Sequence, residues 1–171
     1  SSSEFPSPNN YVLTAEFKKI LGDGNSEDEI LENIKKYSIT FYSCIKNILK
    51  CVTEGKSSFI YCEYVFGSGG ILFSLILELF GFKRATGSEQ TKGRRYAIIN
   101  NETVNKTEQK DLMKRFNEPD NLHGEYINVI IGSKVVVEGF SFLNIQAEYI
   151  FTPHWNYSET DQAIARGYRY G

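Results

Sequence analysis

Apolar residues recur at helical spacing in the first third of the chain. In residues 26–37 isoleucine and leucine side chains lie three to four positions apart, after a serine and a glutamate spaced as in a capping box. A second stretch with the same period covers residues 40–54, and Gly55 follows it as a helix stop. The pattern therefore predicts two consecutive amphipathic helices.

Beyond residue 57, short apolar runs of strand length alternate with stretches of helical period. The strand-like runs are residues 59–65, 96–99, 127–131 and 148–151, and the helix-like stretches between them are residues 71–80 and 107–116. Such alternation predicts an α/β fold with a mostly parallel central sheet flanked by helices.

The composition is typical of a soluble globular domain. The 171 residues are 41% hydrophobic and 23% charged, which excludes a disordered or collagen-like chain. Because the formal net charge is only −2, no global positive field attracts nucleic acid, and any such contact must come from a local patch. One basic cluster is either a solvated loop or a phosphate contact: Lys83, Arg84, Lys92, Arg94 and Arg95.

Cysteine and histidine are too few and too scattered to predict a zinc site. Cys44, Cys51 and Cys62 form no CxxC pair, and only two histidines could assist them. We therefore expect no metal site, and we expect an intracellular, reducing compartment. The longest apolar run, residues 71–80, is too short to cross a bilayer, so we expect no membrane contact.

Two arginines and a glutamine share one face of a predicted C-terminal helix that starts at Ser158. Gln162, Arg166 and Arg169 follow one another at intervals of four and three residues, which aligns their side chains on a helix. Arginine keeps its charge at physiological pH and offers a planar fork of donors suited to phosphate oxygens. The face is therefore either a solvent-exposed basic stripe or a phosphate-binding surface.

The preceding segments favour the phosphate-binding alternative. An apolar run ends at Gly132 and leads into Ser133, Lys134 and a Glu138-Gly139 turn. In this order and spacing the chain resembles the second RecA-like domain of superfamily 2 helicases and translocases. It is most similar to the Snf2-like branch and to the NTPase-helicases of large nucleocytoplasmic DNA viruses. The resemblance spans residues 37–171 and implies a three-layer RecA-like fold for them. We therefore interpret residues 1–36 as an N-terminal helical extension or linker.

The resemblance implies a catalytic role for the C-terminal motif. Arg166 and Arg169 match the two arginines of helicase motif VI, which act as arginine fingers on ATP. The ATP and its Mg²⁺ would be held mainly by a first RecA-like domain of the same polypeptide. Gln162 matches the polar residue that couples the nucleotide state to domain closure. If the protein is viral, the resemblance implies that it is located in the virion or the viral factory.

Two further motifs are implied to line the cleft between the lobes. Ser133 and Lys134 match the part of motif V that touches the nucleic-acid backbone, and Glu138 and Gly139 match the part on the nucleotide side. The implied partner is therefore a nucleic acid, either DNA or RNA. Motif IV and the turn after it are implied to supply the remaining nucleic-acid contacts, at Tyr61, Cys62 and Gly67.

A phosphate loop of the form G-x-x-x-x-G-K-[ST] does not occur in these 171 residues. We therefore expect the chain to be the C-terminal lobe of a nucleic-acid-dependent ATPase and to be inactive by itself. Two alternatives stay open. One is a non-catalytic RecA-like module that binds nucleic acid or a transcription protein, and the other is a free-standing nucleotide-binding enzyme that uses the turn at residues 67–70.

Overall fold

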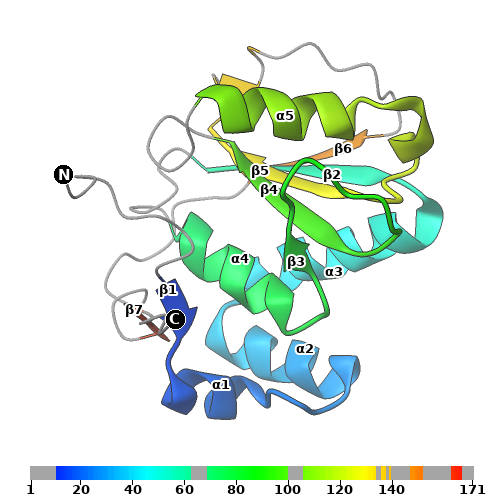
Figure 1. The fold of residues 1–171 in the computed structure, drawn as a ribbon. Helices are drawn as coiled ribbons and strands as arrows, with labels where there is room; N and C mark the ends of the chain where they lie inside the picture. The colour runs from blue at the N-terminus through cyan, green and yellow to red at the C-terminus, as the bar shows by residue number, and fades with distance from the viewer. Residues whose placement is uncertain are drawn as a thin grey trace, which may run out of the picture.

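A five-stranded parallel sheet forms the centre of the fold (Figure 1). The computed structural model describes residues 11–62, 69–99, 106–133, 136–137, 139, 147–151 and 163–166. In chain order the elements are β1 (Tyr11–Leu13), α1 (Ala15–Leu21), α2 (Glu27–Tyr37), α3 (Ile39–Glu54), β2 (Ser57–Tyr61), α4 (Gly70–Glu78), β3 (Lys83–Arg84), β4 (Arg95–Ile99), α5 (Lys106–Phe116), the 3₁₀ helix η2 (Pro119–Asn121), β5 (Val129–Gly132), β6 (Ala147–Phe151) and β7 (Ile164–Arg166).

Local capping explains where the N-terminal helices begin and end. The hydroxyl of Ser26 accepts a hydrogen bond from the backbone N–H of Glu29, as the capping-box pattern predicts. Gly55 ends α3 in the left-handed conformation with a φ of 71°. The two predicted helices are therefore confirmed. The pattern does not predict α1, whose N-cap residue Thr14 accepts a hydrogen bond from the N–H of Phe17.

The strands lie in the order β3-β4-β5-β2-β6, and every neighbouring pair is parallel. β2 lies between β5 and β6, with Tyr61 opposite Gly132 on one side and Phe151 on the other. Parallel strands all end at the same edge of a sheet, so the loops that follow them are brought together there. This carboxyl edge is where the predicted motif IV and motif V begin.

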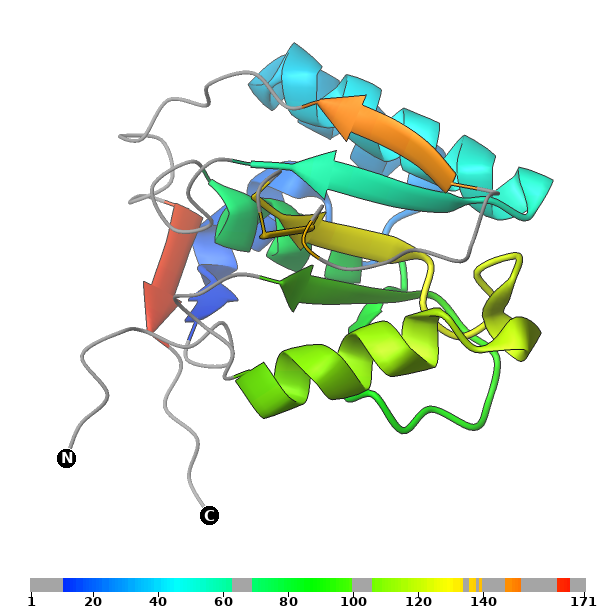
Figure 2. The same cartoon turned by 90° about the horizontal axis from the view of Figure 1, so that it is seen from above.

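Helices cover both faces of the sheet (Figure 2). Side chains alternate between the faces along each strand. In β2, Phe59 packs against α5, with its ring centre 5.6 Å from that of Phe116, whereas Ile60 packs in the core beneath α3 and α4. A parallel sheet buried on both faces is typical of α/β proteins. The predicted three-layer, RecA-like α/β fold is confirmed.

The N-terminal helices share a hydrophobic core with the layer formed by α3 and α4. Phe17, Leu21, Ile30 and Ile34 are at most 6% exposed and belong to the same cluster of buried side chains as Ile60 of the sheet. The hydrophobic core is therefore continuous from α1 to the central strands. The division of the chain into residues 1–36 and 37–171 stays a prediction from the sequence.

The predicted C-terminal helix is wrong for residues 164–166. Ile164–Arg166 forms β7, which is antiparallel to β1, with Tyr11 opposite Arg166 and Leu13 opposite Ile164. Hydrogen bonds to β1 replace those that residues 164–166 would make within a helix, so tertiary pairing overrides the local helical pattern. Gln162 and Arg169, which were to share the helical face, lie outside the described residues.

Candidate nucleotide and nucleic-acid interface

The ends of β2 and β5 bring the predicted motif IV next to motif V. Tyr61 lies opposite Gly132, and the backbone N–H of Cys62 donates a hydrogen bond of 2.9 Å to the carbonyl of Gly132. Tyr61 and Cys62 are only 6% and 3% exposed. Their side chains lie in the two cores, so burial favours a structural role for these side chains over direct contact with nucleic acid. Their assignment as nucleic-acid contacts stays a prediction.

Gly132 allows β5 to approach the end of β4 closely. A Cβ atom added at this glycine would collide with the carbonyl oxygen of Ile99 and would lie 2.9 Å from Cγ2 of Val137. The carbonyl belongs to a neighbouring strand and cannot turn away as a flexible side chain can. The sequence motifs assign no role to Gly132, although a glycine that ends an apolar strand can mark a close approach of two backbones.

Ser133 begins a tight turn directly after β5. Its hydroxyl accepts a hydrogen bond of 3.3 Å from the N–H of Val136, and its carbonyl accepts one of 2.9 Å from the N–H of Val137. Val137 is buried against α5, whereas Gly139 is exposed and donates its N–H to the carbonyl of Val136. The start of the motif V loop is therefore held against the sheet edge, with Gly139 at the surface.

Several predicted site residues lie outside the described residues: Gly67, Lys134, Glu138, Gln162 and Arg169. For Arg166 the structure describes the backbone, which lies in β7. Figure 2 shows β7 on the side of the molecule toward which the arrows of β2, β4 and β6 point. The segment that carries Arg166 therefore lies on the same side as the carboxyl edge, where Tyr61 and Ser133 are located.

Arg94 and Arg95 of the basic cluster are engaged within the protein. Arg94 forms an ion pair of 2.7 Å with Glu27 of α2 and donates a hydrogen bond to the carbonyl of Phe80. Arg95 donates to the carbonyls of Thr91 and Tyr126. Both arginines lie at or next to the first residue of β4, which is the opposite edge of the sheet from the predicted motifs. These contacts favour a structural role for the two arginines over phosphate binding.

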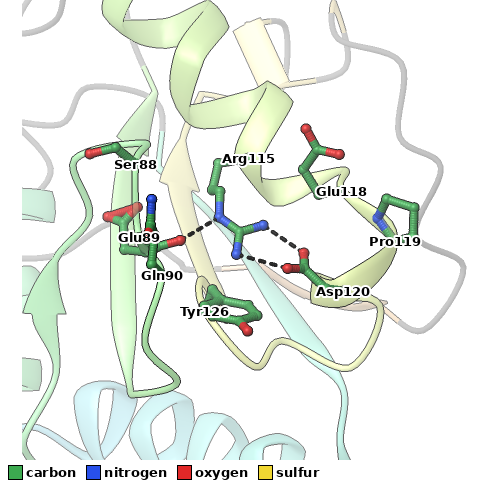
Figure 3. A pocket seen from close by; sticks show the side chains of 8 residues that line it. All are labelled: Ser88, Glu89, Gln90, Arg115, Glu118, Pro119, Asp120 and Tyr126. Carbon is green, nitrogen blue, oxygen red and sulfur yellow. Dashed lines mark hydrogen bonds and ion pairs between the residues drawn. The ribbon is translucent and has the colours of Figure 1, made fainter.

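A pocket of about 580 Å³ lies at the same amino edge of the sheet (Figure 3). The guanidinium of Arg115 crosses it, donating to both carboxylate oxygens of Asp120, at 2.6 and 3.2 Å, and to the carbonyl of Glu89 at 2.8 Å. It also lies over the ring of Tyr126 at 4.1 Å. All three guanidinium nitrogens of Arg115 are thus bonded within the protein, which favours a structural role over anion binding.

The ion pair between Arg115 and Asp120 shifts the pKa of both side chains. The hydrogen bonds from Arg115 lower the pKa of Asp120, and the same bonds raise the pKa of Arg115. The sequence pattern does not predict this ion pair. Arg115 lies in the last turn of α5 and Asp120 lies five residues later in η2, so the two residues do not have the spacing of an ion pair within one helix.

Cysteines in the described residues are buried and chemically protected. Cys44, Cys51 and Cys62 form no disulfide, and burial raises the pKa of the Cys44 thiol to about 11, which keeps it protonated at neutral pH. In the part of the chain that the structure describes, no group of three or more His, Cys, Asp or Glu side chains could hold a metal ion. Within the same residues, no helix is long and apolar enough to span a membrane.

Comparison with known families decides the assignment. Residues 40–171 match the family described as "Helicase conserved C-terminal domain". The chain belongs to this helicase C-terminal domain family. The family resemblance predicted from the sequence is therefore confirmed, and the matched region begins within α3, after β1, α1 and α2.

The relatives of this helicase C-terminal domain include proteins of large DNA viruses. It is 50% identical over 146 residues to the candidate helicase 087L of Invertebrate iridescent virus 3, covering 84% of this chain and 15% of that protein. It is 41% identical over 140 residues to the candidate helicase 009L of Frog virus 3, covering 82% of this chain and 14% of that protein. A candidate ATP-dependent RNA helicase of Heliothis virescens ascovirus 3e is 32% identical over 149 residues, and the match covers 87% of this chain and 15% of that protein.

The chain therefore spans about 15% of the length of these viral relatives. No solved structure matches the helicase C-terminal domain significantly. Family membership thus rests on the sequence match over residues 40–171. The α/β fold with its parallel sheet is consistent with that match.

Proposed function

We propose that this domain supplies half of the active site of a nucleic-acid-dependent ATPase, a helicase or duplex translocase. A first RecA-like domain elsewhere in the same polypeptide would bind ATP and Mg²⁺. Arg166 and Arg169 would reach that ATP as the cleft closes and stabilise the charge that develops on the transferred phosphoryl group. Gln162, Glu138 and Gly139 would couple this closure to the nucleotide state.

One observation carries the proposal: the end of β2 and the start of the motif V loop meet at a single sheet edge. Tyr61 lies opposite Gly132, and Ser133 follows at once with a turn anchored by Val137. Open parallel sheets bind their ligands outside the carboxyl ends of the strands. Residues on these loops, Ser133 and Lys134 among them, would then move along a nucleic-acid strand each time the cleft closes.

Nucleotide hydrolysis would require the partner domain. The 171 residues contain no phosphate loop, and we propose that the isolated domain neither binds ATP tightly nor hydrolyses it. The names of the relatives, which include an RNA helicase and a nucleoside triphosphatase, support nucleotide use by the whole protein. An intracellular, reducing location and a viral setting belong to the same proposal.

Replacing the first arginine of the motif tests the proposed function. In the full-length protein we expect Arg166→Ala to lower nucleic-acid-stimulated ATP hydrolysis on the order of a thousandfold, because an arginine finger contributes that much to phosphoryl transfer. Arg166→Lys should restore little, since lysine keeps the charge but lacks the planar fork of donors. Nucleic-acid affinity, measured by fluorescence anisotropy, should stay within about threefold of the parent protein.

A matched variant controls for the loss of a positive charge. Lys114 is exposed in the last turn of α5, toward the amino edge of the sheet, and Lys114→Ala should leave turnover unchanged. Unchanged ATP turnover in Arg166→Ala would contradict the assignment of Arg166 as an arginine finger. If the full-length parent binds nucleic acid but hydrolyses no ATP at all, the domain is a non-catalytic binding module instead.

A further inference from the structure

Strand β1 pairs with the segment that carries Arg166. The two strands are antiparallel, with Tyr11, Val12 and Leu13 opposite Arg166, Ala165 and Ile164. The ladder continues for one more residue, because the N–H of Thr14 donates a hydrogen bond of 2.9 Å to the carbonyl of Ala163. The backbone of the proposed arginine finger is thus held by a segment some 150 residues away in the sequence.

The pairing is anchored in the hydrophobic core. Leu13 is 5% exposed and Ala163 is 1% exposed, and both belong to the cluster that contains Phe17 of α1 and the apolar side chains of α4. Ile164 is half-buried against the same cluster. The β1–β7 ribbon therefore has a defined position on the domain, beside α4 (Figure 1).

The conformation of residues 164–166 depends on this partner. A strand of three residues cannot persist alone, and an isolated two-stranded ribbon is at best marginally stable in water. The local sequence, moreover, has a helical pattern that the pairing overrides. The matched family region begins at residue 40, so β1 lies outside the part of the chain that defines the family.

We propose that β1 is a positioning element of the ATPase half-site. It fixes the backbone of residues 164–166 so that Arg166 approaches the nucleotide from a set position when the two lobes close. The inference rests on the proposed function, since it assumes that Arg166 contacts the nucleotide. The backbone of β1 acts through that of residues 164–166 and makes no contact with ATP, and the exposed Val12 side chain takes no part in this positioning.

A proline substitution can remove the pairing with little change in side-chain packing. Hydrogen-bonded and non-hydrogen-bonded pairs alternate along an antiparallel ladder. Since Thr14 and Ala163 are hydrogen-bonded, the next such pair is Val12 and Ala165. The Val12 side chain is 43% exposed, so Val12→Ala keeps the N–H and loses little contact, whereas Val12→Pro removes the ladder N–H.

The experiment measures ATP hydrolysis by the full-length protein with saturating nucleic acid. We expect Val12→Pro to lower kcat at least tenfold with the KM for ATP within twofold, and Val12→Ala to stay within twofold in both constants. The amide of Ala165 should exchange its hydrogen at least tenfold faster in Val12→Pro than in Val12→Ala. Unchanged nucleic-acid affinity and melting temperature would show that Val12→Pro is folded.

A disulfide across the same pair tests the inference in a second way, should Val12→Pro fail to fold. Ala165 is exposed and lies directly opposite Val12 on the ribbon. In the double variant V12C/A165C, oxidation should lock the ribbon and leave turnover within twofold of the reduced form. A tenfold loss of turnover on oxidation, reversed by reduction, would show that the ribbon must open and would overturn the positioning role.

The two proposals fail in different ways. If Arg166→Ala is inactive while Val12→Pro has full turnover despite rapid exchange at Ala165, the positioning role is overturned and the proposed function stands. If Arg166→Ala has full turnover, the proposed function is overturned. The positioning role of β1 is then overturned as well, because it assumes that Arg166 contacts the nucleotide. A selective loss of kcat in both variants supports both.

Discussion

Single side chains at the amino edge of the sheet stabilise the long connection between α5 and β5. Asn121 is fully buried and its amide donates to the carbonyls of Phe116 and Ile127, while its oxygen accepts from the N–H groups of Tyr126 and Ile127. Arg115 ties the same connection to the loop at Glu89. These bonds satisfy buried backbone groups that no regular element pairs, so the loop is ordered by side chains.

The ion pair between Arg115 and Asp120 predicts a specific dependence of stability on pH. Because the hydrogen bonds from Arg115 lower the pKa of Asp120 in the folded state, the ionised carboxylate stabilises the fold. This contribution is present above the ordinary aspartate pKa of about 4 and is lost as the pH falls through the lowered value. Asp120→Asn should therefore melt at a lower temperature than the parent at pH 7, and the difference should vanish at strongly acid pH.

Thermal melting followed by circular dichroism between pH 2 and pH 8 measures the effect. Asp23→Asn is the control, because Asp23 is exposed in the turn after α1 and its replacement makes the same change in charge. A difference between Asp120→Asn and the parent that is constant across this pH range would contradict the assigned role of the ion pair.

At the scale of elements, the close approach of β4 and β5 depends on Gly132. An alanine there would place its Cβ against the carbonyl of Ile99, and adjacent hydrogen-bonded strands cannot separate without loss of the ladder. We expect Gly132→Ala to lower the free energy of unfolding by about 1–3 kcal/mol, the usual cost of overpacking a core. Urea denaturation measures this change.

Gly93 provides the matched control for this substitution. A Cβ at Gly93 would come no closer than 3.7 Å to the guanidinium of Arg95, which is ordinary van der Waals contact, and the backbone of Gly93 has no positive φ. Gly93→Ala should therefore change the free energy of unfolding by less than about 0.5 kcal/mol, as at most surface positions. Equal effects of the two substitutions would contradict the tight approach of β5 to β4.

The elements that sequence patterns predict are those whose stability is largely local. The capping box at Ser26 and the terminal Gly55 mark helices that the structure confirms, and apolar runs mark the central strands. β7 could not be predicted, since its conformation depends on pairing with Tyr11–Leu13 at the other end of the sequence. The resemblance implies that motifs IV and V contact one nucleic acid, and the strands that lead into them, β2 and β5, are neighbours in the sheet. It does not predict that the side chain of Tyr61 is buried, because that depends on packing against the rest of the fold.

At the scale of the whole molecule, the first helices are integrated with the sheet by packing and by charge. Ile34 of α2 is fully buried in the cluster that also contains Ile60 of β2. The ion pair between Glu27 and Arg94 adds a second link between α2 and the start of β4. A continuous core of this kind unfolds as one cooperative unit in most single domains.

Cooperative unfolding predicts that a cavity in α2 weakens the centre of the sheet. Ile34→Ala should lower the free energy of unfolding by about 2–5 kcal/mol, the cost of truncating a buried isoleucine. Hydrogen exchange at the amides of β5 should then become faster by the factor that corresponds to the same loss of free energy, because we expect amides of a central strand to exchange only when the whole domain unfolds. Ile20→Ala, at a position that is 56% exposed on α1, should change neither quantity measurably. If Ile34→Ala accelerates exchange in α1 and α2 but leaves β5 protected, the N-terminal helices unfold independently of the sheet, which would contradict the single cooperative unit.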